Sequence, residues 1–383
     1  MKKGGTPGGT YAILVRDFGK SSSGGEKMKM TNQFIRNGMP MYDVDGTRMH
    51  VQFPHIIFHN HKYYLYGSNK EFSNGTGIWH WGIKMYESED LYNWKEVGII
   101  IPPNETDVNS PLYPQKTMDA PCIVYNKKTD TWVCWLIEMN EQKAYTLVSE
   151  SLFGPYHFTG EGFFPCGLTI GDFDIAETED GKAYIYFNNP HERIICGELT
   201  EDYTATTGQY TSILERSEGV PFVREAPAHF YRDGKNYLIT SGTTAFFPNP
   251  SEIAVGSHLG EYKTIGDPHV GDESKTSFHS QIRSVFKVPG KKDLYIALAD
   301  RWLPDYMHVP YEKIRDWYYA RYHGVSKEQS QVAARELEDH YNIVLGCMKQ
   351  DVSRAECVFL PIVFEDEKPL IYWRDAWSLA EFE

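Results

Sequence analysis

The chain has 383 residues, 41% of them hydrophobic and 23% charged, which is the balance of a globular protein with a sizeable core. Its formal net charge of −14 argues against nucleic acid and anionic membranes as partners, because both favour clustered Lys and Arg. No apolar run approaches the length of a membrane span, and the length of the chain fits one large all-β domain or two smaller domains.

Residues 1–30 are rich in Gly, Ser and Lys, which predicts a flexible or draped segment ahead of one domain over 31–383. The apolar run from Tyr11 to Val15 is too short for a signal peptide. We therefore expect a cytoplasmic protein, although a secreted chain trimmed of its leader would read the same.

Five hairpin units follow, each made of a β-rich run, a short polar turn and a second β-rich run. The units begin at Pro54, Ala120, Phe173, Ala226 and Ile282. Two turns read DGK and another PGKK, in which Gly accepts a positive φ. A repeat of roughly 50 residues with several short strands is the size of a propeller blade. The chain is thus predicted to be all-β, a five-bladed β-propeller, because a β-sandwich would not explain the even spacing.

Residues 310–345 break this pattern. Pro310 suits a first helical turn, Gly324 interrupts the run, and the stretch from Ser326 is dense in good helix formers. We predict a helical insertion in the last blade. It could line the substrate cleft, form a homo-oligomer contact or be an inert decoration of the surface.

A polar residue opens each of the last four units: Asp119, Asp172, Glu225 and Gln281. Because the innermost strand of each blade runs along the central axis, residues at one end of these strands should meet in a single site. Clustered carboxylates suit glycoside hydrolysis, in which one acid protonates the leaving oxygen and another group activates water or attacks the sugar. Like charges held close also raise one pKa and keep that acid protonated.

Several segments in chain order resemble glycoside hydrolase family 43, most of all its exo-β-1,3-galactanase-like group. The segments are MYESEDLYNWKEVG from Met85, DAPCIVYN from Asp119, DFDIAETEDGKAYIYF from Asp172, REAPAHFYRDGKNYLITSG from Arg224, TSFHSQ from Thr276 and DRW from Asp300. The resemblance covers roughly residues 40–305 and 355–380, and the last three motifs together are highly specific.

The resemblance implies an inverting exo-glycosidase acting on galactose-containing oligosaccharides, with no required cofactor and with Ca²⁺ or Na⁺ in the central channel of some relatives. It implies that Glu225 is the general acid and that Asp172 raises the pKa of that acid. Gln281 matches a position where water is activated, and Asp119 matches a sugar-contacting Glu. The alternatives are an α-L-arabinofuranosidase or β-xylosidase of the same family and a non-catalytic carbohydrate-binding protein.

The first unit departs from the family pattern, because HVQFPHIIF from His50 has neither the usual Asp nor the Ala-His-Gly-Gly-Gly segment of the galactanases. The water-activating group therefore stays open between two residues. Gln281 is a poor base in its ordinary tautomer, whereas the carboxylate of Asp119 could deprotonate water directly.

Four further residues are candidates for sugar binding. Arg224 precedes the acid and could instead form a structural ion pair, His279 and Arg301 flank the Gln281 unit, and Trp302 is either a stacking platform or core. We expect no metal ligands: the six cysteines lack zinc spacing, and strand alternation should spread the histidines near His55 over different faces.

Overall fold

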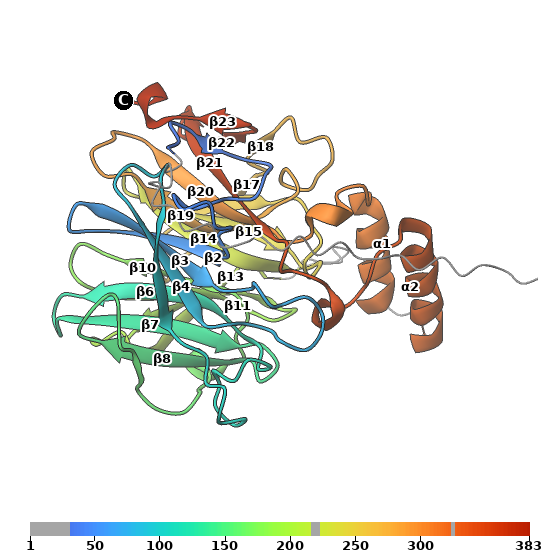
Figure 1. Cartoon of the computed structure of the whole chain (residues 1–383), viewed down its shortest axis with the longest axis horizontal. Helices are drawn as coiled ribbons and strands as arrows, with labels where there is room; N and C mark the ends of the chain where they lie inside the picture. Colours follow the sequence, from blue (N-terminus) through green and yellow to red (C-terminus); the bar gives the residue numbers. More distant parts are fainter. Residues whose placement is uncertain (1–30, 216–222, 323–325) are drawn as a thin grey trace, which may run out of the picture.

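The computed structural model describes residues 31–215, 223–322 and 326–383, so the segment predicted for 1–30 lies outside the described residues. Five sheets surround a central axis and form a five-bladed β-propeller, which confirms the predicted fold (Figure 1).

The first four blades each contain four antiparallel strands in chain order. The strands are β2 (Gln52–His59), β3 (Lys62–Ser68), β4 (Ile83–Ser88) and β5 (Lys95–Ile101) in blade one; β6 (Met118–Asn126), β7 (Thr131–Glu138), β8 (Lys143–Ser149) and β9 (His157–Phe158) in blade two; β10 (Phe173–Glu177), β11 (Ala183–Asn189), β12 (Arg193–Leu199) and β13 (Thr206–Ile213) in blade three; and β14 (Arg224–Arg232), β15 (Lys235–Gly242), β16 (Glu252–Gly256) and β17 (Tyr262–Gly266) in blade four.

The fifth blade is the irregular one. Its order is β18-β22-β21-β20-β19, with β18 parallel to β22 and the other pairs antiparallel. Its strands are β18 (His269–Val270), β19 (Gln281–Lys287), β20 (Tyr295–Arg301), β21 (Glu356–Glu365) and β22 (Lys368–Tyr372). The short strand β1 (Ile35–Arg36) pairs with β23 (Ala376–Trp377) and joins the two ends of the described chain.

The predicted helical insertion lies between β20 and β21 and consists of α1 (Tyr311–Tyr322) and α2 (Lys327–Tyr341). Ser326 caps α2 by accepting a hydrogen bond from the backbone N–H of Gln329. Both helices lie beyond the ends of the strands on one side of the propeller (Figure 1). Trp317 and Leu337 join the hydrophobic cluster that contains Trp302, so the insertion packs on the propeller itself. No helix in the described residues is long and apolar enough to cross a membrane.

The innermost strands β2, β6, β10, β14 and β19 contact one another around the axis, and β19 contacts β2 to close the ring. Most residues of β6 and β10 are buried, and β14 combines buried with partly buried residues, as expected for strands with neighbours on both faces. The hydrophobic core lies between the blades: Val124 and Trp135 of blade two share one cluster with Ile175 and Ile185 of blade three. Ring closure therefore brings residues distant in sequence to a common axis.

A β-bulge recurs at the start of three inner strands. The strand register shifts between Gln52 and His55, between Asp119 and Cys122, and between Glu225 and Ala228. The first residue inside each bulge has a left-handed backbone and precedes a proline: Phe53 (φ 55), Ala120 (φ 54) and Ala226 (φ 49). Bulges of this kind bend a strand and re-aim a side chain, and they are frequent beside active sites.

The shared bulge identifies Gln52 as the blade-one counterpart of Asp119 and Glu225, an equivalence that the sequence analysis missed. Gln52 is 1% exposed, and its Oε1 has no hydrogen-bond partner among the described residues. The signal was present in the sequence as a polar residue followed two positions later by proline, the same pattern as Asp-Ala-Pro and Glu-Ala-Pro.

Candidate active site

Glu225 lies near the start of β14, at the end of the strand where the register shifts in a bulge. Burial raises the pKa of Glu225 to about 8, and the negative charge of Asp172 adds to the rise. The guanidinium groups of Arg283 and Arg224 oppose this shift. Because its pKa lies above neutrality, Glu225 is mainly protonated at neutral pH and can donate a proton.

Asp172 immediately precedes β10, and its backbone carbonyl accepts a hydrogen bond from the backbone N–H of Asn188 at 3.0 Å. Its carboxylate Oδ1 lies 2.8 Å from Nη2 of Arg283. Arg283 is the extra residue where the register of β19 shifts between Ile282 and Ser284. The sequence analysis did not single out Arg283, although it is the only cation inside the otherwise neutral run QIRSVF. The ion pair supports Asp172 as a negative charge beside the acid.

Gln281 opens β19 and contacts both Glu225 and Arg283, the ion-pair partner of Asp172. Its Nε2 donates to Ser241 Oγ at 2.8 Å and to Glu225 Oε1 at 3.4 Å. Its Oε1 accepts from Trp302 Nε1 at 3.0 Å and from Arg283 Nη1 at 3.3 Å. Both groups around Oε1 can only donate, so the orientation of the amide is determined by the network. All four hydrogen-bonding positions of the side chain are occupied.

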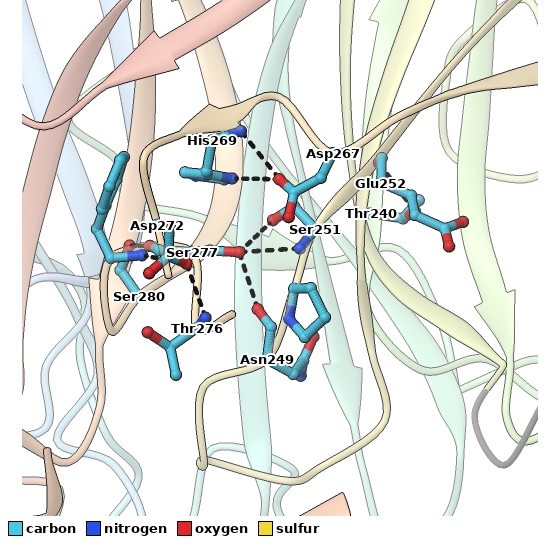
Figure 2. Close-up of polar contacts among 12 residues, drawn as sticks. Thr240, Asn249, Ser251, Glu252, Asp267, His269, Asp272, Thr276, Ser277 and Ser280 are labelled. Atoms are coloured by element: carbon cyan, nitrogen blue, oxygen red, sulfur yellow. Dashed lines mark hydrogen bonds and ion pairs between the residues drawn. The ribbon is translucent and has the colours of Figure 1, made fainter. Parts of the chain in front are cut away.

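A strained turn precedes Gln281. Ser277, Phe278 and His279 all have φ between 53 and 57°, a run of left-handed residues that costs roughly 1–2 kcal/mol per residue. Figure 2 shows what holds this turn: Ser277 Oγ accepts from the backbone N–H of Ser251 at 2.9 Å and donates to the carbonyl of Asn249 at 2.8 Å. Blade four therefore anchors the turn that places Gln281.

Asp119 lies in a separate polar cluster on the same rim. It is fully buried, and its carboxylate contacts Lys70 Nζ at 2.6 and 2.9 Å and Trp79 Nε1 at 2.5 Å. Burial raises the pKa of Asp119, whereas Lys70 opposes the rise. Nearby Asp300 is also fully buried, and burial raises its pKa to about 8. Lys70 and Asp300 were not predicted, because neither belongs to a strand-opening position.

The four predicted sugar-binding residues fall into different places. Trp302 is 3% exposed and packs edge-on against Phe53, with ring centroids 5.0 Å apart, so it lies beside Gln281 inside an aromatic cluster. The Nε of Arg224 donates to Thr240 Oγ1 at 3.0 Å and lies 3.7 Å from a carboxylate oxygen of Glu252, two residues labelled in Figure 2. The side chain of Arg224 is thus held within its own blade.

His279 and Arg301 line a cavity of about 490 Å³ together with Asp272, Glu273, Met307 and Trp373. Glu225 and Asp172 are not among the residues of this cavity. The guanidinium of Arg301 lies 5.3 Å from the ring centroid of Trp373 and donates to the carbonyl of Phe278 at 3.0 Å. The structure therefore brings Glu225, Asp172, Gln281 and Trp302 together and places His279 and Arg301 on a neighbouring surface.

The helical insertion borders the acid. Burial raises the pKa of Cys347, just after α2, to about 11, and the negative charge of Glu225 contributes to this rise. Tyr311 at the start of α1 in turn interacts electrostatically with Arg224. Of the three roles open from the sequence, this proximity and the packing of Trp317 and Leu337 in one cluster with Trp302 favour lining the site.

The chain matches the model of glycosyl hydrolases family 43 over residues 47–320. A comparison with curated proteins gives no match. Among solved structures, a family 43 β-1,3-galactosidase is similar with a TM-score of 0.73 and 24% identity, over 92% of this chain and 65% of that one. This chain thus spans about two thirds of the length of that protein.

Two further structures are similar. A family 43 β-1,3-galactosidase solved with galactodeoxynojirimycin has a TM-score of 0.72 and 24% identity, over 90% of this chain and 100% of the other. An exo-β-1,3-galactanase from Phanerochaete chrysosporium, solved with β-1,3-galactotriose, has a TM-score of 0.69 and 18% identity, over 91% and 68%. At these identities the likeness establishes the shared fold.

Proposed function

The chain belongs to glycosyl hydrolases family 43 and is a glycoside hydrolase, and on this premise we propose that it is an inverting exo-glycosidase that removes terminal galactose from β-1,3-linked oligosaccharides. The observation that carries the proposal is the pair of Glu225 and Asp172, in which a half-buried acid is kept protonated by desolvation and, to a lesser extent, by the neighbouring charge of Asp172. The choice of galactose rests on the names of the similar structures, a β-1,3-galactosidase and an exo-β-1,3-galactanase.

In the proposed reaction, Glu225 donates its proton to the glycosidic oxygen as the bond to the sugar breaks. Asp172 is held by its contact with Arg283, and its charge raises the proton affinity of Glu225. Gln281 holds the acid in place through its 3.4 Å contact with Glu225 Oε1. These three groups supply the acid half of the reaction.

We assign water activation to Asp119 rather than to Gln281. The single oxygen of Gln281 already accepts two N–H donors, so no lone pair is left for a water proton. The amide also lies 3.4 Å from the acid, whereas inversion needs the two groups about 6.5–9.5 Å apart. A carboxylate has about four acceptor positions, and Oδ1 of Asp119 accepts no hydrogen bond among the described residues beside its 2.6 Å ion pair with Lys70.

The position of Asp119 around the axis supports this assignment. Asp119 opens the inner strand of blade two and Glu225 that of blade four, two strands that do not adjoin in the ring: β6 contacts β10 and β2, and β14 contacts β10 and β19. Gln281 opens a strand that adjoins that of Glu225. A residue of blade two is therefore better placed to activate a water on the sugar face opposite the acid.

The test is hydrolysis of β-1,3-galactobiose and β-1,3-galactotriose, followed by chromatography of the products and by proton NMR of the first anomer formed. We expect galactose as the only early monosaccharide, released from one chain end and appearing first as the α-anomer. Aryl α-L-arabinofuranoside and aryl β-xyloside serve as the matched alternatives. Turnover of either of these in place of the galactosides would contradict the choice of galactose as the substrate. First appearance of the β-anomer would contradict inversion.

A further inference from the structure

Three side chains from neighbouring blades meet in the central channel, three positions along the inner strands from the bulge residues in blades one and two. They are His55 of β2, Cys122 of β6 and Asp174 of β10, and their donor atoms all lie within 4.8 Å of one another. His55 Nε2 is 3.7 Å from Asp174 Oδ1, and Cys122 Sγ is 4.0 Å from the same oxygen. None of the three belongs to the acid machinery described above.

The imidazole of His55 is oriented by its other nitrogen. His55 Nδ1 lies 3.1 Å from the carbonyl oxygen of Phe53. A carbonyl only accepts, so Nδ1 carries a proton, and the tautomer with this single proton has its lone pair at Nε2. This atom is buried and has no hydrogen-bond partner among the described residues. A lone pair and a carboxylate oxygen thus face each other, an arrangement that a cation between them would satisfy.

The carboxylate of Asp174 is held in the same way. Its Oδ1 accepts from the backbone N–H of Ile175 at 2.9 Å, and its Oδ2 accepts from the backbone N–H of His229 at 2.7 Å. Outer hydrogen bonds of this kind, to a backbone carbonyl for the histidine and from backbone N–H groups for the carboxylate, are typical of the shell around metal ligands.

We propose that His55, Cys122 and Asp174 bind one divalent transition-metal ion, with Zn²⁺ the best fit. A donor set of nitrogen, sulfur and oxygen suits zinc, whereas Ca²⁺ and Na⁺ would require oxygen ligands throughout. Around a tetrahedral zinc ion with bonds of about 2.0–2.3 Å, ligand atoms lie about 3.3–3.8 Å apart. The two separations to Asp174 Oδ1 are 3.7 and 4.0 Å and the third lies within 4.8 Å, so the ligands need to close by about 1 Å or less.

The charges balance in the bound state. Cys122 loses its thiol proton to solvent as the sulfur–metal bond forms, so thiolate and carboxylate together neutralise the divalent ion. Because the ligands come from three successive inner strands, the ion links blades one, two and three. The carbonyl that orients His55 belongs to Phe53, so the ion also supports the bulge that carries Gln52.

The test uses the full chain after treatment with a chelator and then titration with Co²⁺ or Zn²⁺. We expect one Co²⁺ per chain, with a thiolate-to-cobalt charge-transfer band and tetrahedral visible bands. Cys122→Ser should remove the charge-transfer band and weaken Zn²⁺ binding about 100-fold or more. Cys134→Ser is the matched control, because Cys134 is equally buried in blade two and lies outside the cluster.

His55→Gln provides a second variant, expected to weaken binding while retaining the cysteine. Zn²⁺ should raise the Tm of the wild type and of Cys134→Ser, and leave that of Cys122→Ser unchanged. The proposal is overturned if the folded wild type takes up no Co²⁺, which would leave a metal-free contact between His55 and Asp174. It is equally overturned if the charge-transfer band persists in Cys122→Ser.

Discussion

The guanidinium of Arg283 lies 2.8 Å from the carboxylate of Asp172. This contact has two effects on the acid. It holds the carboxylate of Asp172 beside Glu225, and the charge of Asp172 raises the pKa of Glu225, whereas the positive charge of Arg283 opposes the same rise. Beyond the larger effect of burial, the proton affinity of Glu225 is therefore adjusted by an ion pair made by blades three and five, neither of which carries the acid.

Replacement of Glu225 by Gln should reduce kcat/KM on β-1,3-galactobiose about 10²–10⁴-fold, because the leaving sugar loses its proton donor. The phenolate of an aryl galactoside with an acidic phenol leaves without protonation. The reduction of kcat/KM on such a substrate should therefore be much smaller. Glu252→Gln is the control in the same blade, since Glu252 contacts Arg224 rather than the acid. Equal losses on both substrates would contradict the acid assignment.

The pH profile should show a basic limb near pH 8. Glu225 must be protonated to donate, and its pKa is raised to about 8, so kcat/KM should hold below this pH and fall above it. Asp172→Asn removes a charge that raises this pKa, so the limb should move to lower pH. Asp180→Asn, on the surface of the same blade, should leave the limb in place. An unmoved limb in Asp172→Asn would exclude Asp172 as the modulator.

Asp119→Ala should abolish hydrolysis and be rescued by azide, because a small anion can replace the activated water. With a β-galactoside the rescued product should be the α-galactosyl azide, detected by mass spectrometry and NMR. Gln281→Ala should lower kcat, because Glu225 loses a contact that positions it, and should show no azide rescue. Rescue of Gln281→Ala in place of Asp119→Ala would reverse the assignment of the two residues.

Arg283→Met should lower the free energy of unfolding by about 3–5 kcal/mol, because it leaves the largely buried Asp172 without its counter-charge. The comparison is Arg374→Met, which breaks a 2.7 Å pair with Glu381 whose side chains are 33% and 42% exposed. That loss should stay below about 1 kcal/mol. Urea unfolding monitored by tryptophan fluorescence measures both. Similar losses in the two variants would show that the Asp172 contact is no stronger than a surface pair.

Much of the fold was predictable because its signals are local. Hairpin turns such as DGK and the alternation of β-rich runs lie within single blades, and the predicted unit starts at Pro54, Ala120, Phe173, Ala226 and Ile282 fall within or at the start of β2, β6, β10, β14 and β19. The helical insertion was equally visible, since helix formers and a breaker are properties of neighbouring residues. Gln52 was missed although its Gln-Phe-Pro motif shares the polar-x-Pro pattern of Asp-Ala-Pro and Glu-Ala-Pro.

Side-chain partners across the axis were beyond prediction. Asp172 and Arg283 are 111 residues apart, and His55 meets Cys122 and Asp174 only once blades one to three surround the channel. The histidines near His55 were judged by their own spacing, which cannot show ligands contributed by other strands.

The sequence by itself determined the number of blades, the residues that open their inner strands and the family, because each depends on patterns short enough to read along the chain. The tertiary structure alone decided which of these residues act on one another. Ring closure fixes the distances between strands, and these distances make Gln281 a fully bonded neighbour of Glu225 while they leave Asp119 paired with Lys70 in blade one.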